Sequence, residues 1–224
     1  MQSYALKHGD SFAVFDEAGT LRGLFHRDTR HLLRLDLTVD GAAPEVTGLW
    51  PSEDNTVLLS ALKHAQGTLS RARFVWRDCL YERVHLRNFG PQARRITLDI
   101  AFAADFADLF EVRGHRRAHR GEDLPASIAA DRVTLAYRGL DGRERTTCLT
   151  FDPPPVRFDA SGARFELELA PRSTRSIFIT IACTKQSPAA FFEALRAARR
   201  DLHDVMARAT PRRTQPATAS CRRW

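Results

Sequence analysis

ITLDIAF, residues 96–102, is the stretch of sequence that decides the fold class of this chain. Its apolar side chains alternate with Thr97, Asp99 and Ala101, so that every second residue is strongly apolar. Successive side chains of a β-strand point to opposite faces of the sheet. The alternation therefore predicts a strand with one face on a core and the other toward water.

The same period of two recurs along the chain. It is found at residues 33–39, 133–137, 165–169 and 177–181, and we expect further strands over 12–15 and 74–86. Turn-forming pairs such as Asp-Gly and Ser-Gly separate these segments, because glycine and aspartate tolerate tight backbone bends. The stretch 84–102, with Asn-Phe-Gly-Pro at its centre, reads as one long hairpin.

Many strands with regular turns predict an all-β protein. We expect a large antiparallel β-sandwich, supersandwich-like, over residues 1–184, with two sheets packed face to face. A closed barrel produces the same alternation and stays open as an alternative.

The C-terminal part of the chain changes period. Residues 185–209 are expected to form a linker helix, helical from about 188 to 208, with Ser187 as its N-cap and Pro188 in its first turn. The apolar stripe of this helix is expected to consist of Phe192, Leu195, Leu202, Met206 and Ala209. The last segment, 210–224, is polar, basic and without periodicity, and is expected to be disordered.

The composition narrows the range of functions. The chain of 224 residues carries a net charge of +7 and four cysteines, none of them in a CxxC pair. It has no signal peptide or membrane span, so we expect a cytoplasmic protein. No motif for a nucleotide, a cofactor or a metal occurs, and His26 and His31 lack a third ligand; we expect no cofactor and no metal.

The positive charge is concentrated in part in RGHRRAHR, residues 113–120. A nucleic-acid site usually interleaves such a run with aromatic residues that stack on bases, and this run has none. A solvated loop is the favoured interpretation, and a basic nucleic-acid-binding β-domain remains an alternative.

Two segments break the alternation, 23–30 and 105–114, and both place charges next to aromatic residues. Carboxylates and arginines in a sheet protein are buried only when paired, so these segments predict ion-pair networks or polar ligand contacts. Sugar recognition uses the same mixture, but structural salt bridges are the favoured interpretation. A glycosidase needs two carboxyl groups roughly 5 to 10 Å apart, and nothing in the sequence holds Asp105 and Asp108 around a pocket.

At these segments the chain resembles a known family. The motifs are GLFHRDTRHL (23–32), RLDLTVDG (34–41), DNTVLL (54–59), LYERVHLRNFG (80–90) and ADFADLFEVRG (104–114). They are similar, in the same order, to the N-terminal domain of bacterial amylo-α-1,6-glucosidase (glycogen debranching) proteins. The resemblance runs from about residue 4 to residue 205.

The resemblance implies a β-sandwich whose catalytic carboxylates lie in a separate C-terminal barrel of paired helices, which hydrolyses α-1,6 linkages. Here the chain passes from the linker helix into the basic segment 210–224, so we expect a product without the catalytic domain and without activity of its own. The implied partners are that helical domain and an α-glucan, with no membrane. An active α-1,6-glucosidase using Asp105, Asp108 or Glu111 is the enzymatic alternative.

Residue by residue, the family motifs fall mostly on charged positions. They are His26, Arg27, Asp28, Thr29, Arg30, Asp105, Phe106, Asp108, Glu111 and Arg113. The resemblance places them at the face that meets the helical domain, where they either stabilise that contact or form a rim of the substrate cleft. We favour the first, since interdomain contacts are commonly polar and charged.

Overall fold

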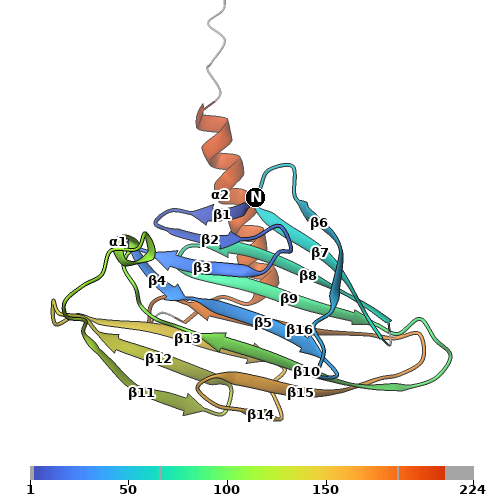
Figure 1. The fold of residues 1–224 in the computed structure, drawn as a ribbon. Coiled ribbons are helices and arrows are strands. Elements are labelled where there is room, and N and C mark those ends of the chain that lie inside the picture. Colours follow the sequence, from blue (N-terminus) through green and yellow to red (C-terminus); the bar gives the residue numbers. More distant parts are fainter. Residues whose placement is uncertain (1–2, 66, 186, 210–224) are drawn as a thin grey trace, which may run out of the picture.

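The computed structural model describes residues 3–65, 67–185 and 187–209 (Figure 1). Its sixteen strands form three antiparallel sheets, and two helices complete the described part of the chain. The all-β fold predicted from the alternation is confirmed. The C-terminal segment 210–224, predicted to be disordered, lies outside the described residues.

Two of the sheets have four strands each. The first small sheet has the order β1-β2-β3-β4, with β1 (Tyr4–His8), β2 (Ser11–Phe15), β3 (Leu21–His26) and β4 (Thr29–Leu32). The second small sheet has the order β14-β15-β10-β5, with β5 (Arg34–Val39), β10 (Arg94–Ala103), β14 (Arg157–Phe158) and β15 (Gly162–Leu169).

The large sheet has eight strands in the order β11-β12-β13-β16-β9-β8-β7-β6. They are β6 (Glu45–Pro51), β7 (Val57–His64), β8 (Gly67–Trp76), β9 (Cys79–Arg87), β11 (Glu122–Ala129), β12 (Arg132–Arg138), β13 (Glu144–Asp152) and β16 (Thr174–Ala182). Within the described residues, β6 and β11 pair with one neighbour only, so the sheet is open and the fold is a sandwich, not a closed barrel.

The core lies between the large sheet and the two small ones (Figure 1). Leu24 from the first small sheet, Leu98 from the second and Leu58 from the large sheet belong to this one apolar cluster, and all three are fully buried. The alternation at 96–102 is confirmed, because all four of its large apolar residues are buried. Leu33 is the exception in its own set: it lies in the bend between β4 and β5, where the chain changes sheets, and is 39% exposed.

The predicted strand 74–86 is two strands. β8 ends at Trp76 and β9 begins at Cys79, joined by the turn of Arg77 and Asp78, in which Arg77 has a φ of 55°. Both faces of this hairpin are covered, so apolar residues continue up to the turn on either side and the two strands read as one. Arg-Asp is also not one of the pairs that mark a hairpin turn in a sequence.

The predicted hairpin over 84–102 is wrong. β9 pairs with β8 and β16 in the large sheet, whereas β10 pairs with β15 and β5 in the second small sheet. Since both edges of β9 are occupied, β10 has no free edge beside it and crosses to the other layer. Asn88, almost fully buried, holds this crossing through its side-chain amide, which donates to the carbonyl oxygens of Gln92, Leu169 and Ala170.

The two helices differ in size and in exposure. α1 (Leu109–Val112) is a single turn with no buried residue, and α2 (Phe191–Ala209) lies on the outer face of the large sheet. Phe191, Ala194 and Ala198 pack there against residues of the large sheet such as Phe74 and Tyr81. None of the described helices is long and apolar enough to cross a membrane.

Two details of the predicted helix are wrong. It begins at Phe191 and not at Pro188, and Ser187 is not its cap, because the carbonyl of Ala190 accepts the first helical hydrogen bond from Ala194. The buried stripe contains Phe191 instead of Phe192, which is 48% exposed. Phe191 packs inside the contact between α2 and the sheet, whereas Phe192 lies at its margin, with its ring 5.7 Å from that of Phe178. The side chains of Met206 and Ala209 lie outside the described residues, and the boundaries at 184 and 209 stay predictions.

Candidate functional site

The two charged segments of the sequence lie side by side in the structure. Arg27 and Asp28 form the tight turn between β3 and β4, with φ angles of 44° and 62°. Beyond the turn, the Arg30 amide donates to the carbonyl of Ala107 (2.8 Å), and the Leu109 amide donates to the carbonyl of Asp28 (3.1 Å). The segment after β10 is thereby fixed along β4.

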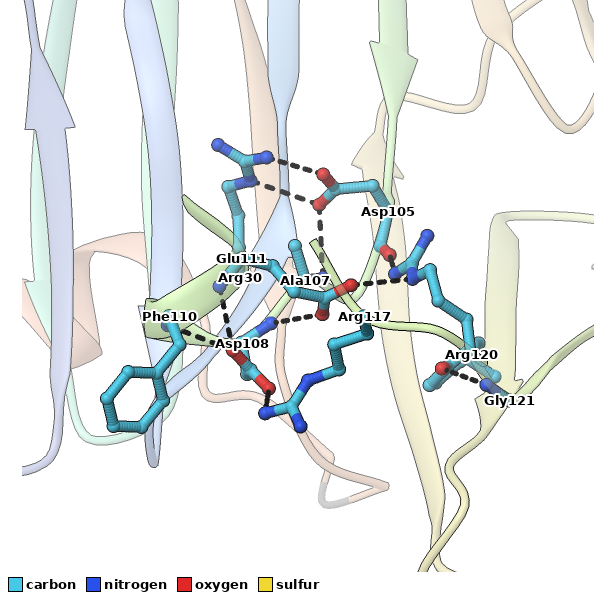
Figure 2. Close-up of polar contacts among 10 residues, drawn as sticks. Arg30, Asp105, Ala107, Asp108, Phe110, Glu111, Arg117, Arg120 and Gly121 are labelled. Carbon is cyan, nitrogen blue, oxygen red and sulfur yellow. Dashed lines mark hydrogen bonds and ion pairs between the residues drawn. The ribbon is translucent and has the colours of Figure 1, made fainter. Parts of the chain in front are cut away.

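A bidentate ion pair between Arg30 and Asp105 joins the two segments (Figure 2). The Arg30 guanidinium donates from Nε to Asp105 Oδ1 (3.0 Å) and from Nη2 to Asp105 Oδ2 (2.5 Å). Both side chains are largely shielded, with 16% and 24% of their surface exposed. Such a planar fork fixes the orientation of both partners as well as attracting them.

A capping box holds the short helix α1. Asp108 Oδ1 accepts hydrogen bonds from the amides of Phe110 and Glu111, both at 2.9 Å. The Glu111 carboxylate reaches back and accepts from the Asp108 amide at 3.0 Å. These bonds satisfy amides that a helix start leaves without partners, which allows a single turn to persist.

Two arginines of the run 113–120 complete the arrangement (Figure 2). Arg117 binds the Asp108 carboxylate, and Arg120 binds Glu111 Oε1 (2.9 Å) and the carbonyl of Asp105 (2.5 Å). The run lies in an exposed loop, as predicted, and these two side chains also form ion pairs within the molecule. We call Arg30, Asp105, Asp108, Glu111, Arg117 and Arg120 the charged cluster. The sequence signal for the pairing is the acidic stretch 105–111 followed at once by the arginines.

The electrostatics of the charged cluster favour the ionised form of the Asp108 carboxylate. Desolvation tends to raise the pKa of Asp108, but the Glu111 amide and the Arg117 guanidinium outweigh it and hold this pKa below its usual range. A glycosidase acid must instead keep its proton near neutral pH. Asp105, Asp108 and Glu111 each bind an arginine, which is the arrangement of a structural ion-pair network.

The remaining predicted residues do not join the charged cluster. His26 binds Ser11 Oγ (2.8 Å), and burial, followed by the charge of Arg27, lowers its pKa. Arg27 approaches Asp10 at 3.9 Å and is exposed. Within the described residues the side chains of Asp28 and Arg113 make no ion pair, and both are exposed.

An aromatic layer lies beneath the charged cluster. Phe106 stacks on Tyr137, with ring centres 5.6 Å apart, and meets the edge of His31 at 5.7 Å. His31 is buried, and its Nδ1 lies 3.0 Å from the carbonyl oxygen of Thr146. Burial lowers the pKa of His31 to about 4, so its ring is neutral and donates from Nδ1. The layer ties the first small sheet to the large one.

The hollow beside the charged cluster is small. It measures about 210 Å³ and is lined in part by Thr29, Phe106 and Tyr137. Pockets for organic ligands usually enclose ~300–1,000 Å³. Among the described residues, no group of three or more His, Cys, Asp or Glu side chains could hold a metal ion.

Exposed apolar side chains occur on α1, at Phe110 and Val112, and at the hollow, which Leu140 lines. Phe110 and Leu140 are 63% and 68% exposed, and Val112 is exposed as well. In Figure 2, Phe110 points away from the ion pairs. A rigid turn that presents an aromatic side chain beside charged groups has the features of a contact surface for another protein unit.

A second set of polar residues was missed at the sequence level. Arg83 and His85 of β9 lie beside Ser176 of β16 on the outer face of the large sheet. Each of the three side chains is hydrogen-bonded to the other two at 3.0 Å. The sequence signal is the alternation of Arg83 and His85 within LYERVHLRNFG, a segment interpreted above as part of a strand and as a family motif. The cross-strand neighbour Ser176 follows from the pairing of β9 with β16.

Comparison with protein families gives one match. A family model described as the N-terminal domain of (some) glycogen debranching enzymes matches residues 6–180. No curated protein matches the chain.

Solved structures with TM-scores above 0.5 share the fold at low identity. A candidate kojibiose phosphorylase from the human microbiome aligns with a TM-score of 0.52 and 8% identity over 91% of this chain, which spans 33% of that protein. A protein from Synechocystis aligns with a TM-score of 0.52 and 11% identity, covering 82% of this chain and 96% of the other. A candidate aldose 1-epimerase from Escherichia coli gives a TM-score of 0.47 and 11% identity over 81% of this chain and 98% of its own.

Proposed function

This chain belongs to the family of N-terminal domains of some glycogen debranching enzymes, and we propose that it is a non-catalytic module that supports the catalytic domain of such an enzyme. The proposal includes contact with an α-glucan and a cytoplasmic location, as expected from the sequence. The catalytic domain would dock at the charged cluster and α1.

One observation carries the interface proposal. α1 is held rigidly by its capping box and by the arginine pairs, yet it buries none of its own side chains and exposes Phe110. A one-turn helix whose side chains stay exposed contributes little to the stability of the sandwich. A partner that buries Phe110 would gain an aromatic anchor already fixed in place, and such anchors dominate binding energy at interfaces.

The enzymatic alternative has less support. The acids that it would use, Asp105, Asp108 and Glu111, are bound by arginines, and the adjacent hollow is too small for a branched glucan. The nucleic-acid alternative also loses support, because Arg117 and Arg120 are engaged within the molecule.

The test is a chimera in which this chain replaces the N-terminal domain of a family enzyme. Glucose release from a branched dextrin and the melting temperature of the catalytic domain are measured for the chimera and for Phe110→Asp. We expect Phe110→Asp to lose most of the glucose release and of the thermal stabilisation that the chimera shows. Phe89→Ala removes an equally exposed aromatic side chain elsewhere and should leave both quantities unchanged. Reducing sugar released by the chain alone, or a chimera indifferent to Phe110→Asp, would overturn the proposal.

A further inference from the structure

The register of the large sheet aligns six outward-facing residues in one line across six neighbouring strands. They are Trp50, Leu59, Ala72, Arg83, Phe178 and Asp152, each paired with the next. Their chain neighbours Leu58, Val84 and Ile179 point into the core, so the line runs over the outer face. We call it the outer row.

Trp50 forms one end of the outer row. Its indole lies over Gly48, two residues earlier on β6: a β-carbon at Gly48 would stand 2.1 Å and 2.3 Å from two atoms of the six-membered ring. Only glycine leaves that space free. The ring therefore rests on the strand, while 54% of the residue's surface stays exposed. Its neighbour in the outer row, Leu59, is 45% exposed, and the two side chains form an exposed apolar patch.

The middle of the outer row is a polar group with fixed orientation. Arg83 Nε donates to Ser176 Oγ, and a second guanidinium nitrogen contacts His85 Nδ1, both at 3.0 Å. Because Nδ1 of His85 faces an arginine donor, it acts as an acceptor, and the ring proton resides on Nε2. The guanidinium also lies over the rings of Phe178 and Phe192, at 5.9 Å and 5.6 Å.

Beyond Phe178 the outer face is hollowed into a groove of about 1,060 Å³. It lies between the outer face of β11, β12, β13 and β16 and the residues that lead into α2. Hydroxyl groups of Thr150 and Thr180 line it, together with Phe178 and Phe192. Its volume is slightly above the ~300–1,000 Å³ of typical sites for organic ligands, whereas the hollow beside the charged cluster falls below that range.

We propose that the outer row and this groove bind a linear segment of an α-glucan, with Trp50 as a stacking platform. The apolar face of a sugar ring suits an indole, and sugar hydroxyls suit the fixed donors and acceptors of Arg83, His85 and the threonines. Four strand spacings separate Trp50 from Phe178, roughly 19 Å. That span exceeds one sugar ring, so the ligand is an oligosaccharide or polymer chain. The identity of the ligand rests on the proposed function.

The test uses the full chain and two defined probes. Binding to glycogen is measured by retardation in a native gel, and binding to maltoheptaose by calorimetric titration. We expect Trp50→Ala to weaken binding of both probes about tenfold. Gly48→Ala should weaken it similarly, although it keeps the indole, because the new β-carbon displaces the ring. Phe110→Ala, an exposed aromatic side chain at the other candidate surface, serves as the matched control and should bind normally.

The outcomes separate the two proposals. Absence of glycogen and maltoheptaose binding by the unaltered chain overturns the glucan site, while the docking role is still tested by Phe110→Asp in the chimera. Binding that survives both Trp50→Ala and Gly48→Ala, or that is lost in Phe110→Ala, overturns the location on the outer row. Unchanged melting temperatures of the variants exclude misfolding as the cause of a loss.

Discussion

Among the described residues, two clusters of arginines and carboxylates lie in opposite surroundings. One is the charged cluster at α1, which is open to solvent on one side. The other consists of Arg71, Arg73 and Glu82, which lie inside the sandwich between the large sheet and the first small sheet. Glu82 is 0% exposed and pairs with Arg71, whereas Arg73 donates to the carbonyl of Gly19 and to Ser60. We call this second set the core ion cluster.

The comparison shows that ion pairs of the same residue types affect the stability of the fold differently according to how deeply they are buried. In the core ion cluster, burial and the charge of Arg71 lower the pKa of Arg73 to about 9. Arg73 Nε and Glu82 Oε2 lack hydrogen-bond partners within the described residues. A buried pair of this kind is weak as a source of stability but costly to break, because truncation leaves a charge without compensation. The charged cluster instead positions a surface and contributes modestly to stability.

The largest expected effect is in the core ion cluster. Glu82→Ala leaves Arg71 buried without its ion-pair partner and removes one of the two carboxylates near Arg73. We expect a loss of about 3–5 kcal/mol in the free energy of unfolding. Urea denaturation measures it. Glu166→Ala, which removes an exposed glutamate from β15, serves as the control and should change stability by less than about 0.5 kcal/mol. A loss below about 1 kcal/mol for Glu82→Ala would show that the buried charges are solvated.

Buried His31, in the aromatic layer beneath the charged cluster, predicts that the stability of the protein depends on pH. The pKa of His31 is about 4 in the folded state, against its ordinary value of 6.5. Between these values the unfolded chain binds a proton that the folded chain does not, so stability is highest above pH 6.5 and falls on acidification. From pH 7.5 to 4.5 we expect this residue to contribute a loss of about 2–3 kcal/mol. Urea unfolding of His31→Gln at the same pH values should show a smaller loss; equal losses would contradict the assignment.

In the charged cluster the cap should matter more than the ion pair. Asp108→Ala removes the acceptor for two amides of α1, and we expect a local loss of about 1 kcal/mol. Hydrogen exchange of the Phe110 and Glu111 amides measures this local opening. Asp108→Asn is the control, since asparagine caps equally well without the charge. If Asn opened α1 as much as Ala, the ion pair and not the cap would hold the turn.

The smallest expected effect comes from Arg117. Its side chain is 41% exposed, and surface ion pairs contribute about 0.2–1 kcal/mol. Arg117→Ala should therefore change the free energy of unfolding by about 0.5 kcal/mol or less, and the difference should shrink at high salt. A loss as large as that of Glu82→Ala would remove the contrast between the two clusters.

Much of the candidate interface could be predicted from the sequence. Arg30, Asp105, Asp108 and Glu111 were expected near one another, and the structure brings them together. His26, Arg27 and Arg113 were selected with them but lie apart from the network, because a neighbour in sequence need not point the same way. Arg117 and Arg120 were missed, since a flexible arginine can reach several carboxylates and only the path of the loop decides which one.

The core ion cluster was beyond prediction for a different reason. Arg71 and Arg73 alternate along β8 as solvent-facing residues would, and nothing local indicates that this face is inside. The first small sheet covers it, and Gly19 in the turn between β2 and β3 brings its carbonyl to the Arg73 side chain.

The sequence by itself determined the local conformation: the period of two places Ile96, Leu98 and Ile100 on one face of a strand, whatever that strand pairs with. Only the tertiary structure decided which strands are partners, as the separation of β9 and β10 into different sheets shows. It also decided that Phe191 and not Phe192 faces the large sheet. The physical reason is that alternation is a property of neighbouring residues, whereas edge pairing and the filling of a core depend on segments far apart in the chain that compete for the same space.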